Sequence, residues 1–331
     1  MFSPRLSCLL LNWFLALTVL QAFTNFVFAF LLTGVAFLLI QVYRIPAIPS
    51  ESLRSRFQQT TGSGKTKDKQ NIILHRAGVY DSPENTLEGV KLAHECGVGG
   101  VEVDLEFTAD GVGVLFHDST LDRTTDGSGP ICHLSYEEVR KLDAAAKHAC
   151  RSKTGPMQIP CLEECIQECL KLDLTLYIDC KSQPEKTAEL LVTLFKKYPA
   201  LYNKAIVCSF YPQVIYSVRR KDPSIVTGLT HRRKVLSTVS EGVLRNKELW
   251  KKIVSPVLDV LLEWSLYSWV WYLCGNSYFL MQKDNLSRHN LNFWTSLGIQ
   301  VIPWTVNDPR EKELFTQSFN CPIITDGMET E

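Results

Sequence analysis

The chain has 331 residues, and its 35 basic and 35 acidic residues leave no formal net charge. A nucleic-acid binder needs an excess of basic residues to neutralise phosphates, so this balance argues against that class of protein. Only Arg5 and Arg44 are charged in the first fifty positions, whereas the rest of the chain carries charge as an ordinary globular domain does. The first interpretation is therefore an apolar anchor followed by one large domain.

Residues 1–45 predict a membrane anchor. Residues 6–43 carry no charge and are nearly all apolar. As one helix they would extend about 57 Å, almost twice the roughly 30 Å of bilayer hydrocarbon. Either one span is flanked by interfacial turns, or two shorter helices form a hairpin that turns near residues 21–25. A cleaved signal peptide is less favoured, because its apolar core would be much shorter.

The number of spans decides on which side of the membrane the domain lies. One span places the domain in the lumen or outside the cell, whereas a hairpin returns it to the cytoplasm. Basic residues that follow the anchor, including Arg44 and Arg54, favour a cytoplasmic domain. Our prediction is an integral protein of the plasma membrane or endomembranes with a lumenal or extracellular domain, where the sequon at Asn285 would be glycosylated.

Residues 46–70 are interpreted as a polar linker, and residues 71–331 as the domain. Short β-rich runs alternate there with helical patterns, which predicts a TIM (β/α)8 barrel. Alternation around Asp110 and Gly111 adds a β-hairpin inserted after the second strand. The predicted strands are 72–75, 101–105, 175–179, 205–209, 226–229, 258–262, 300–305 and 323–325. The predicted helices are 86–95, 162–170, 185–197, 213–221 and 288–297.

Residues 264–282 form a second uncharged stretch, rich in aromatic side chains. This composition suits the headgroup region better than the bilayer centre. If the segment crossed a bilayer, the last two strands would lie across the membrane from the first, and the barrel could not close. We therefore predict that it lies on or dips into the membrane beside the mouth of the barrel.

Two acidic residues of the second predicted strand are candidate metal ligands. Glu102 and Asp104 are two positions apart and point to the same face of the strand. Burying two carboxylates is costly unless a cation offsets their charge, although an edge strand with an outward acidic face is an alternative. Oxygen ligands favour a divalent cation, Mg²⁺ first and Ca²⁺ second, and Asp179 at another strand end would supply a third carboxylate.

Other polar residues follow strand ends, where TIM barrels form their active sites. His75 and His117 could act as general acid and base, although a structural role is common for a single histidine. Arg76 and Lys181 would provide positive charge for a phosphate group. Trp304 is a candidate substrate contact or a packing residue. Together these residues suggest metal-assisted hydrolysis of a phosphate ester.

Several motifs over residues 72–327, in their order and spacing, resemble those of the glycerophosphodiester phosphodiesterase family. The motifs are His75–Gly78 (HRAG), Pro83–Thr86 (PENT), Val101–Asp104 (VEVD), Asp110–Gly111 through His117–Asp118, Trp304–Asn307 (WTVN) and Ile324–Asp326 (ITD).

The resemblance implies a TIM barrel that hydrolyses glycerophosphodiesters, such as glycerophosphoinositol or glycerophospho-N-acylethanolamines, to glycerol 3-phosphate and an alcohol. His75 and His117 would be the acid/base pair. Glu102 and Asp104 would bind the cation, and His117 would also be a candidate ligand.

Two positions depart from the family pattern. Asp179 replaces the glutamate that many members carry in an E-x-K motif, and Ala77 replaces a glycine, which would add a methyl group close to the expected phosphate site. The expected partners are a small lipid-derived phosphodiester and the lipid bilayer; the sequence specifies no protein partner. The alternative functions are a lysophospholipase D that acts on lysophospholipids and a non-catalytic membrane scaffold.

Overall fold

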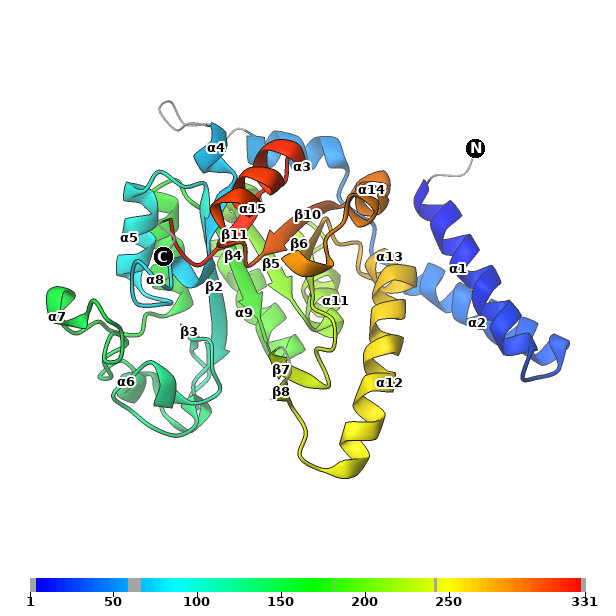
Figure 1. The fold of residues 1–331 in the computed structure, drawn as a ribbon, viewed down its shortest axis with the longest axis horizontal. Helices are drawn as coiled ribbons and strands as arrows, with labels where there is room; N and C mark the ends of the chain where they lie inside the picture. The colour runs from blue at the N-terminus through cyan, green and yellow to red at the C-terminus, as the bar shows by residue number, and fades with distance from the viewer. Residues whose placement is uncertain (1–3, 59–66, 182, 241–242, 329–331) are drawn as a thin grey trace.

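The computed structural model describes residues 4–58, 67–181, 183–240 and 243–328. Eight parallel strands form a nearly closed barrel in the order β10-β9-β6-β5-β4-β2-β1-β11, and helices surround it (Figure 1). Between β10 and β11, the backbone N–H of Val306 donates to the carbonyl of Ile324 at 2.8 Å. The predicted TIM barrel is confirmed. Its strands are β1 (Ile72–Leu74), β2 (Gly100–Phe107), β4 (Thr175–Cys180), β5 (Ala205–Ser209), β6 (Thr227–His231), β9 (Tyr278–Gln282), β10 (Gln300–Trp304) and β11 (Ile323–Thr325).

The predicted hairpin follows β2. Strand β3 (Gly113–Leu115) runs antiparallel to it, with Leu105 opposite Leu115. Gly111 occupies the turn with a φ of 88°, which a residue without a Cβ adopts at little cost. The chain then makes a long excursion, which carries α6 (Tyr136–Val139) and α7 (Arg151–Thr154) on the side of β2 and β3 (Figure 1).

The helices of the outer layer begin where the sequence supplies caps. The hydroxyl of Thr86 accepts the N–H of Gly89 at the start of α5, and proline occupies the first turn of α9 and α11. Their apolar faces pack on the outside of the barrel. These helices are α5 (Leu87–Glu95), α8 (Leu162–Lys171), α9 (Pro184–Lys197), α10 (Leu201–Lys204), α11 (Pro212–Lys221), α14 (Arg288–Ser296) and α15 (Pro309–Glu313).

One predicted strand is wrong. Residues 258–262 lie inside the helix α12 (Leu249–Ser265), and the strand that completes the barrel is β9. Ser255 and Asp259 are one helical turn apart and are both buried, so the polar residues follow a helical period within an apolar run. Before α12, a two-stranded ribbon is formed by β7 (Thr238–Ser240) and β8 (Val243–Leu244).

The structure packs much of the predicted membrane-associating segment 264–282 against the barrel. It runs through a π-helical segment, Leu266–Val270, and α13 (Trp271–Cys274) into the barrel strand β9. Leu266, Trp271 and Phe279 are buried in one cluster, because this helical stretch covers the outside of β6 and β9. The exposed apolar side chains lie earlier in the chain, on α12.

The residues predicted to form the N-terminal anchor fold as a helical hairpin of α1 (Pro4–Gln21) and α2 (Phe26–Tyr43). Both helices are long and apolar enough to cross a membrane. Both free ends of the hairpin meet the barrel domain, because Arg5 donates to the carbonyl of Leu297 and Arg44 to the hydroxyl of Tyr272. Of the two alternatives left by the sequence, the structure thus contains the hairpin.

The predicted linker, residues 46–70, contains structure that belongs to the barrel. Helix α3 (Ser50–Gln58) packs Leu53 against Tyr177 and Tyr278, which point into the barrel near the amino ends of β4 and β9. Burial of this apolar helix face closes the amino end of the barrel. Helix α4 (Lys67–Gln70) precedes β1, and residues 59–66 lie outside the described residues.

Candidate active site

Three buried carboxylates meet at the carboxyl ends of β2 and β4. Glu102 and Asp104 lie on the same face of β2, and Asp104 is the register partner of Asp179 on β4. Among the residues that the structure describes, these three offer ligand oxygens within 4.8 Å of one another, and His117 is not part of the group. The arrangement could hold a metal ion.

The charges of the three carboxylates are unequally compensated. Burial raises the pKa of Asp104, but the Lys181 ammonium at 2.9 Å and other neighbours outweigh it, so the pKa lies below its ordinary value. Burial and the nearby Asp104 raise the pKa of Glu102 to about 6. Burial raises the pKa of Asp179 to about 8, and its Oδ1 is buried without a hydrogen-bond partner. An uncompensated oxygen among three carboxylates fits a hard divalent cation.

His75 follows β1 and is held by a carboxylate. Its Nδ1 lies 2.6 Å from Oδ1 of Asp326, whose other oxygen accepts the side-chain amide of Asn307 at 2.7 Å. The Nε2 atom lies 3.9 Å from Glu102. Burial lowers the pKa of His75, but the hydrogen bond to Asp326 and the charge of Glu102 outweigh this effect and raise it overall.

His117 follows β3 and has the same kind of partner. Its Nδ1 lies 2.5 Å from Oδ1 of Asp118, so Nε2 is the nitrogen that can exchange a proton with a substrate. Burial lowers the pKa of His117, and the Asp118 hydrogen bond offsets this only in part. The pKa values of His75 and His117 are thus displaced in opposite directions, as those of a paired acid and base are.

Two cationic side chains lie beside the carboxylates. The backbone N–H of Arg76 donates to Glu102 at 2.9 Å, and its guanidinium lies 3.6 Å from Asp104. Lys181 contacts Asp104 and also donates to the carbonyl of His117 at 2.6 Å. The residues predicted to bind a phosphate group therefore lie next to those predicted to bind the cation.

Two other residues noted from the sequence, Trp304 and Ala77, have apolar or backbone neighbours. Trp304 ends β10, and its half-buried ring meets Phe210 edge-on at 5.5 Å; its indole N–H is buried without a partner. Ala77 adopts a φ of 61° and is fully buried beside Gly89 of α5. The methyl group that distinguishes this chain from the HRGG pattern thus packs against a helix.

Supporting residues of the site were not singled out from the sequence. Asp118 and Asp326 hold the two histidines, and both are the last residues of motifs named above, which was the available signal. Asn85, in the PENT motif, donates to Asp104 and accepts its backbone N–H, each at 2.9 Å. Arg123 donates to Asp118 at 2.6 Å and to both oxygens of Glu84.

Glu84 in turn accepts a hydrogen bond from Arg76 at 3.1 Å. A chain of ion pairs therefore runs from Arg76 through Glu84, Arg123 and Asp118 to His117. It couples the orientation of one histidine to that of a cationic side chain across the mouth of the barrel.

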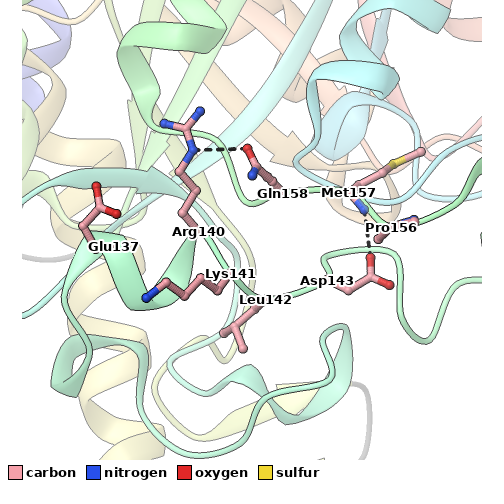
Figure 2. Close-up of a pocket in the computed structure, with 8 residues that line it drawn as sticks. All are labelled: Glu137, Arg140, Lys141, Leu142, Asp143, Pro156, Met157 and Gln158. Carbon is pink, nitrogen blue, oxygen red and sulfur yellow. Dashed lines mark hydrogen bonds between the residues drawn. The ribbon is translucent and has the colours of Figure 1, made fainter.

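A hollow of about 620 Å³ lies on the excursion between β3 and α8, apart from these residues (Figure 2). Its walls include the hydrogen bond from Arg140 to Gln158 at 3.1 Å and that from the N–H of Met157 to Asp143 at 2.9 Å. No residue of the carboxylate group or of the histidine pair lines it.

Residues 75–330 match the glycerophosphoryl diester phosphodiesterase family. The chain belongs to this family. It is 43% identical to human glycerophosphodiester phosphodiesterase 1 over 95% of this chain and 93% of that protein. The mouse protein of the same name is 44% identical over 91% of this chain and 88% of that protein. The predicted family and the predicted enzyme class, a phosphoric diester hydrolase, are confirmed.

Solved structures of the family share the fold. A phosphodiesterase from Oleispira antarctica, in complex with the product sn-glycerol-3-phosphate, matches with a TM-score of 0.58 and 22% identity, covering 77% of this chain and 92% of that chain. An enzyme from Agrobacterium tumefaciens matches with a TM-score of 0.59 and 20% identity, covering 77% of this chain and 96% of that chain.

Proposed function

We propose that this enzyme hydrolyses lipid-derived glycerophosphodiesters to glycerol 3-phosphate and an alcohol, with a divalent cation, at a membrane. The observation that carries the proposal is the pair of histidines, each held through Nδ1 by a carboxylate, beside three buried carboxylates that include the unpartnered Asp179. Glycerophosphoinositol and glycerophospho-N-acylethanolamines are the proposed substrates.

The cation would be held by Glu102, Asp104 and Asp179, with His117 as a further candidate ligand. When bound, Mg²⁺, or Ca²⁺ as the second choice, would supply positive charge that polarises a phosphoryl oxygen. The chain's own cations, Arg76 and Lys181, would orient the phosphate group.

His75 and His117 would move the protons. Asp326 and Asp118 engage their Nδ1 atoms, which fixes the ring orientation and leaves Nε2 as the reactive nitrogen. One imidazole would remove a proton from the water that attacks phosphorus, and the other would protonate the alcohol oxygen as its bond to phosphorus breaks. Trp304 would form part of the wall of the substrate pocket.

An activity panel tests the proposal. The full chain in detergent or vesicles is expected to release glycerol 3-phosphate from glycerophosphodiesters, to lose at least about 100-fold in rate with a chelator, and to recover with Mg²⁺ or Ca²⁺. Product release is measured with deacylated and monoacylated substrates side by side. A preference for monoacylated phospholipids would indicate lysophospholipase D activity instead, and an unchanged rate in chelator would contradict metal dependence.

Arg123 offers a second test within the site. Replacing it by glutamine should lower kcat by roughly tenfold with little change in KM, because Asp118 would no longer be fixed and His117 would lose its orientation. Arg140→Gln, which removes an ion pair with Glu164 away from the histidines, is the matched control. Equal kcat values for the two variants would show that Arg123 does not position His117.

The membrane anchor of this proposal is the α1–α2 hairpin. If both helices cross, the N-terminus and the barrel lie on the same side, because Arg5 and Arg44 both contact the domain. A cytoplasmic N-terminus would then place the barrel in the cytoplasm, and a lumenal or extracellular barrel requires the N-terminus on that side as well. Glycosidase treatment of the expressed protein tests the predicted lumenal or extracellular side. A glycan on Asn285 would support it, whereas an unmodified Asn285 and a barrel open to protease in intact microsomes would indicate the cytoplasm.

A further inference from the structure

Helix α12 distributes its side chains in the opposite way to a helix on a water-exposed surface. Its two buried residues are polar: Ser255 and Asp259 are each 8% exposed. Nine large apolar side chains of the same helix are between 41% and 74% exposed: Leu249, Trp250, Ile253, Val254, Val257, Leu258, Val260, Leu261 and Trp264.

The inward position of the polar residues is built into the fold. The Asp259 carboxylate accepts the backbone N–H groups of Leu236 at 2.8 Å and Ser237 at 3.1 Å. The hydroxyl of Ser255 accepts the side-chain amide of Asn246 at 2.8 Å. These bonds orient α12 so that its apolar side faces outward. The β7–β8 ribbon extends the same surface, since Val239 and Val243 are also more than half exposed.

Exposed apolar patches of this extent on soluble proteins mark an interaction surface. The structure indicates that the partner of this patch is a lipid bilayer, because α12 continues into the segment that contacts the α1–α2 hairpin. The π-helical segment Leu266–Val270 contacts α1, and the hydroxyl of Ser268 donates to the side chain of Asn12 at 3.2 Å. Trp13 and Phe37 of the hairpin pack on the same cluster as Leu266. A bilayer that receives the hairpin therefore also meets α12.

Charges at the start of α12 point to the same partner. Lys247 and Lys252 are exposed, and the Lys251 ammonium lies 5.4 Å from the centre of the Trp250 ring. Basic side chains around a tryptophan are typical of the headgroup region of an anionic membrane. Arg245, also exposed, precedes them.

Helix α12 is not free to span the bilayer. Residues 249–274 are long and apolar enough to do so, but the second half of this stretch is buried against the barrel, where Trp271 is inaccessible. The free part begins after β6 and the β7–β8 ribbon, on the side where the strands end and the site lies, and projects past the sheet (Figure 1).

We propose that α12 and the β7–β8 ribbon form a docking surface for an anionic lipid leaflet, with α12 lying in the headgroup region beside the mouth of the barrel. This surface would admit phosphodiesters whose leaving group carries an acyl chain from the leaflet. That second statement rests on the proposed function, whereas docking itself does not.

Docking is tested without catalysis by fluorescence. The full chain is reconstituted in phosphatidylcholine–phosphatidylserine vesicles made with or without brominated acyl chains. The emission of Trp250 is obtained by subtracting the fluorescence intensity of Trp250→Phe from that of wild type in the same vesicles. Contact quenching by brominated lipid is expected to remove more than about half of this difference. An unquenched difference would overturn the proposal, whatever the enzyme hydrolyses.

The catalytic consequence is tested with a double variant, Val257→Asp with Leu261→Asp, and the matched control Leu314→Asp, which changes an exposed leucine elsewhere. The hairpin is expected to retain all forms on vesicles. For the double variant, we expect about a tenfold slower rate on a vesicle-borne N-acylated phosphodiester and an unchanged rate on soluble glycerophosphoinositol. The control Leu314→Asp should hydrolyse both substrates at the wild-type rate. Equal rates of double variant and wild type on the vesicle-borne substrate would refute lipid access through this surface. A wild type inactive on both substrates would instead refute the proposed function.

Discussion

Replacing His117 by alanine is expected to lower kcat for glycerophosphodiester hydrolysis by about 10²–10⁴-fold, the usual contribution of a positioned general acid or base. Asp118 holds the imidazole through Nδ1, and the His117 side chain is 33% exposed, so Nε2 can reach a bound substrate. Steady-state rates of the full chain with saturating substrate and cation measure the effect.

The control is His94→Ala, because His94 is an exposed residue of α5 whose ring lies 3.0 Å from the carbonyl of Leu172. Added imidazole should restore part of the activity of His117→Ala by occupying the vacated space, and should not affect the control. Unchanged activity of His117→Ala would show that His117 is neither the general acid nor the general base.

Replacing Asp179 by asparagine should abolish stabilisation by the cation and at the same time make the metal-free protein more stable. The reason is that the carboxyl group of Asp179 is buried, has a pKa raised to about 8, and leaves Oδ1 without a partner. For wild type, saturating Mg²⁺ or Ca²⁺ at about 100 times Kd should add roughly 3 kcal/mol to the free energy of unfolding. The variant should show little of this gain.

The pH dependence follows from the raised pKa of Asp179. Between its unfolded pKa near 3.9 and about 8, the unfolded state has lost the proton that the folded state still holds, so metal-free stability falls as pH rises through this window. The upper bound for this loss is roughly 6 kcal/mol. Asp179→Asn removes the loss, so its advantage in Tm should be absent near pH 4 and largest above pH 8.

Thermal unfolding in chelator across this pH range measures the difference. Asp173→Asn, on the surface before β4, is the control, because Asp173 is exposed and pairs with Lys204. If Asp179→Asn has the same Tm profile as wild type in chelator, burial of the Asp179 carboxylate does not destabilise the metal-free protein. If the variant keeps the full stabilisation by the cation, Asp179 is not a metal ligand.

The local sequence determined most of the barrel. Alternating apolar residues and helix caps such as Thr86 predict elements that need few distant contacts, and seven of the eight barrel strands were placed from them. The carboxylates and histidines could be predicted because TIM barrels collect the residues that follow their strands at one end, which brings Asp104 and Asp179 into register.

Tertiary structure decided what periodicity alone leaves open. Residues 258–262 have the composition of a strand, yet they form part of α12, because Asp259 bonds to the backbone of the preceding ribbon and β9 occupies the place between β6 and β10. Likewise, the apolar run 264–282 covers the barrel, and α12 exposes its apolar side chains. Whether an apolar segment meets protein or lipid depends on which neighbours the fold supplies, and those neighbours are distant in the sequence.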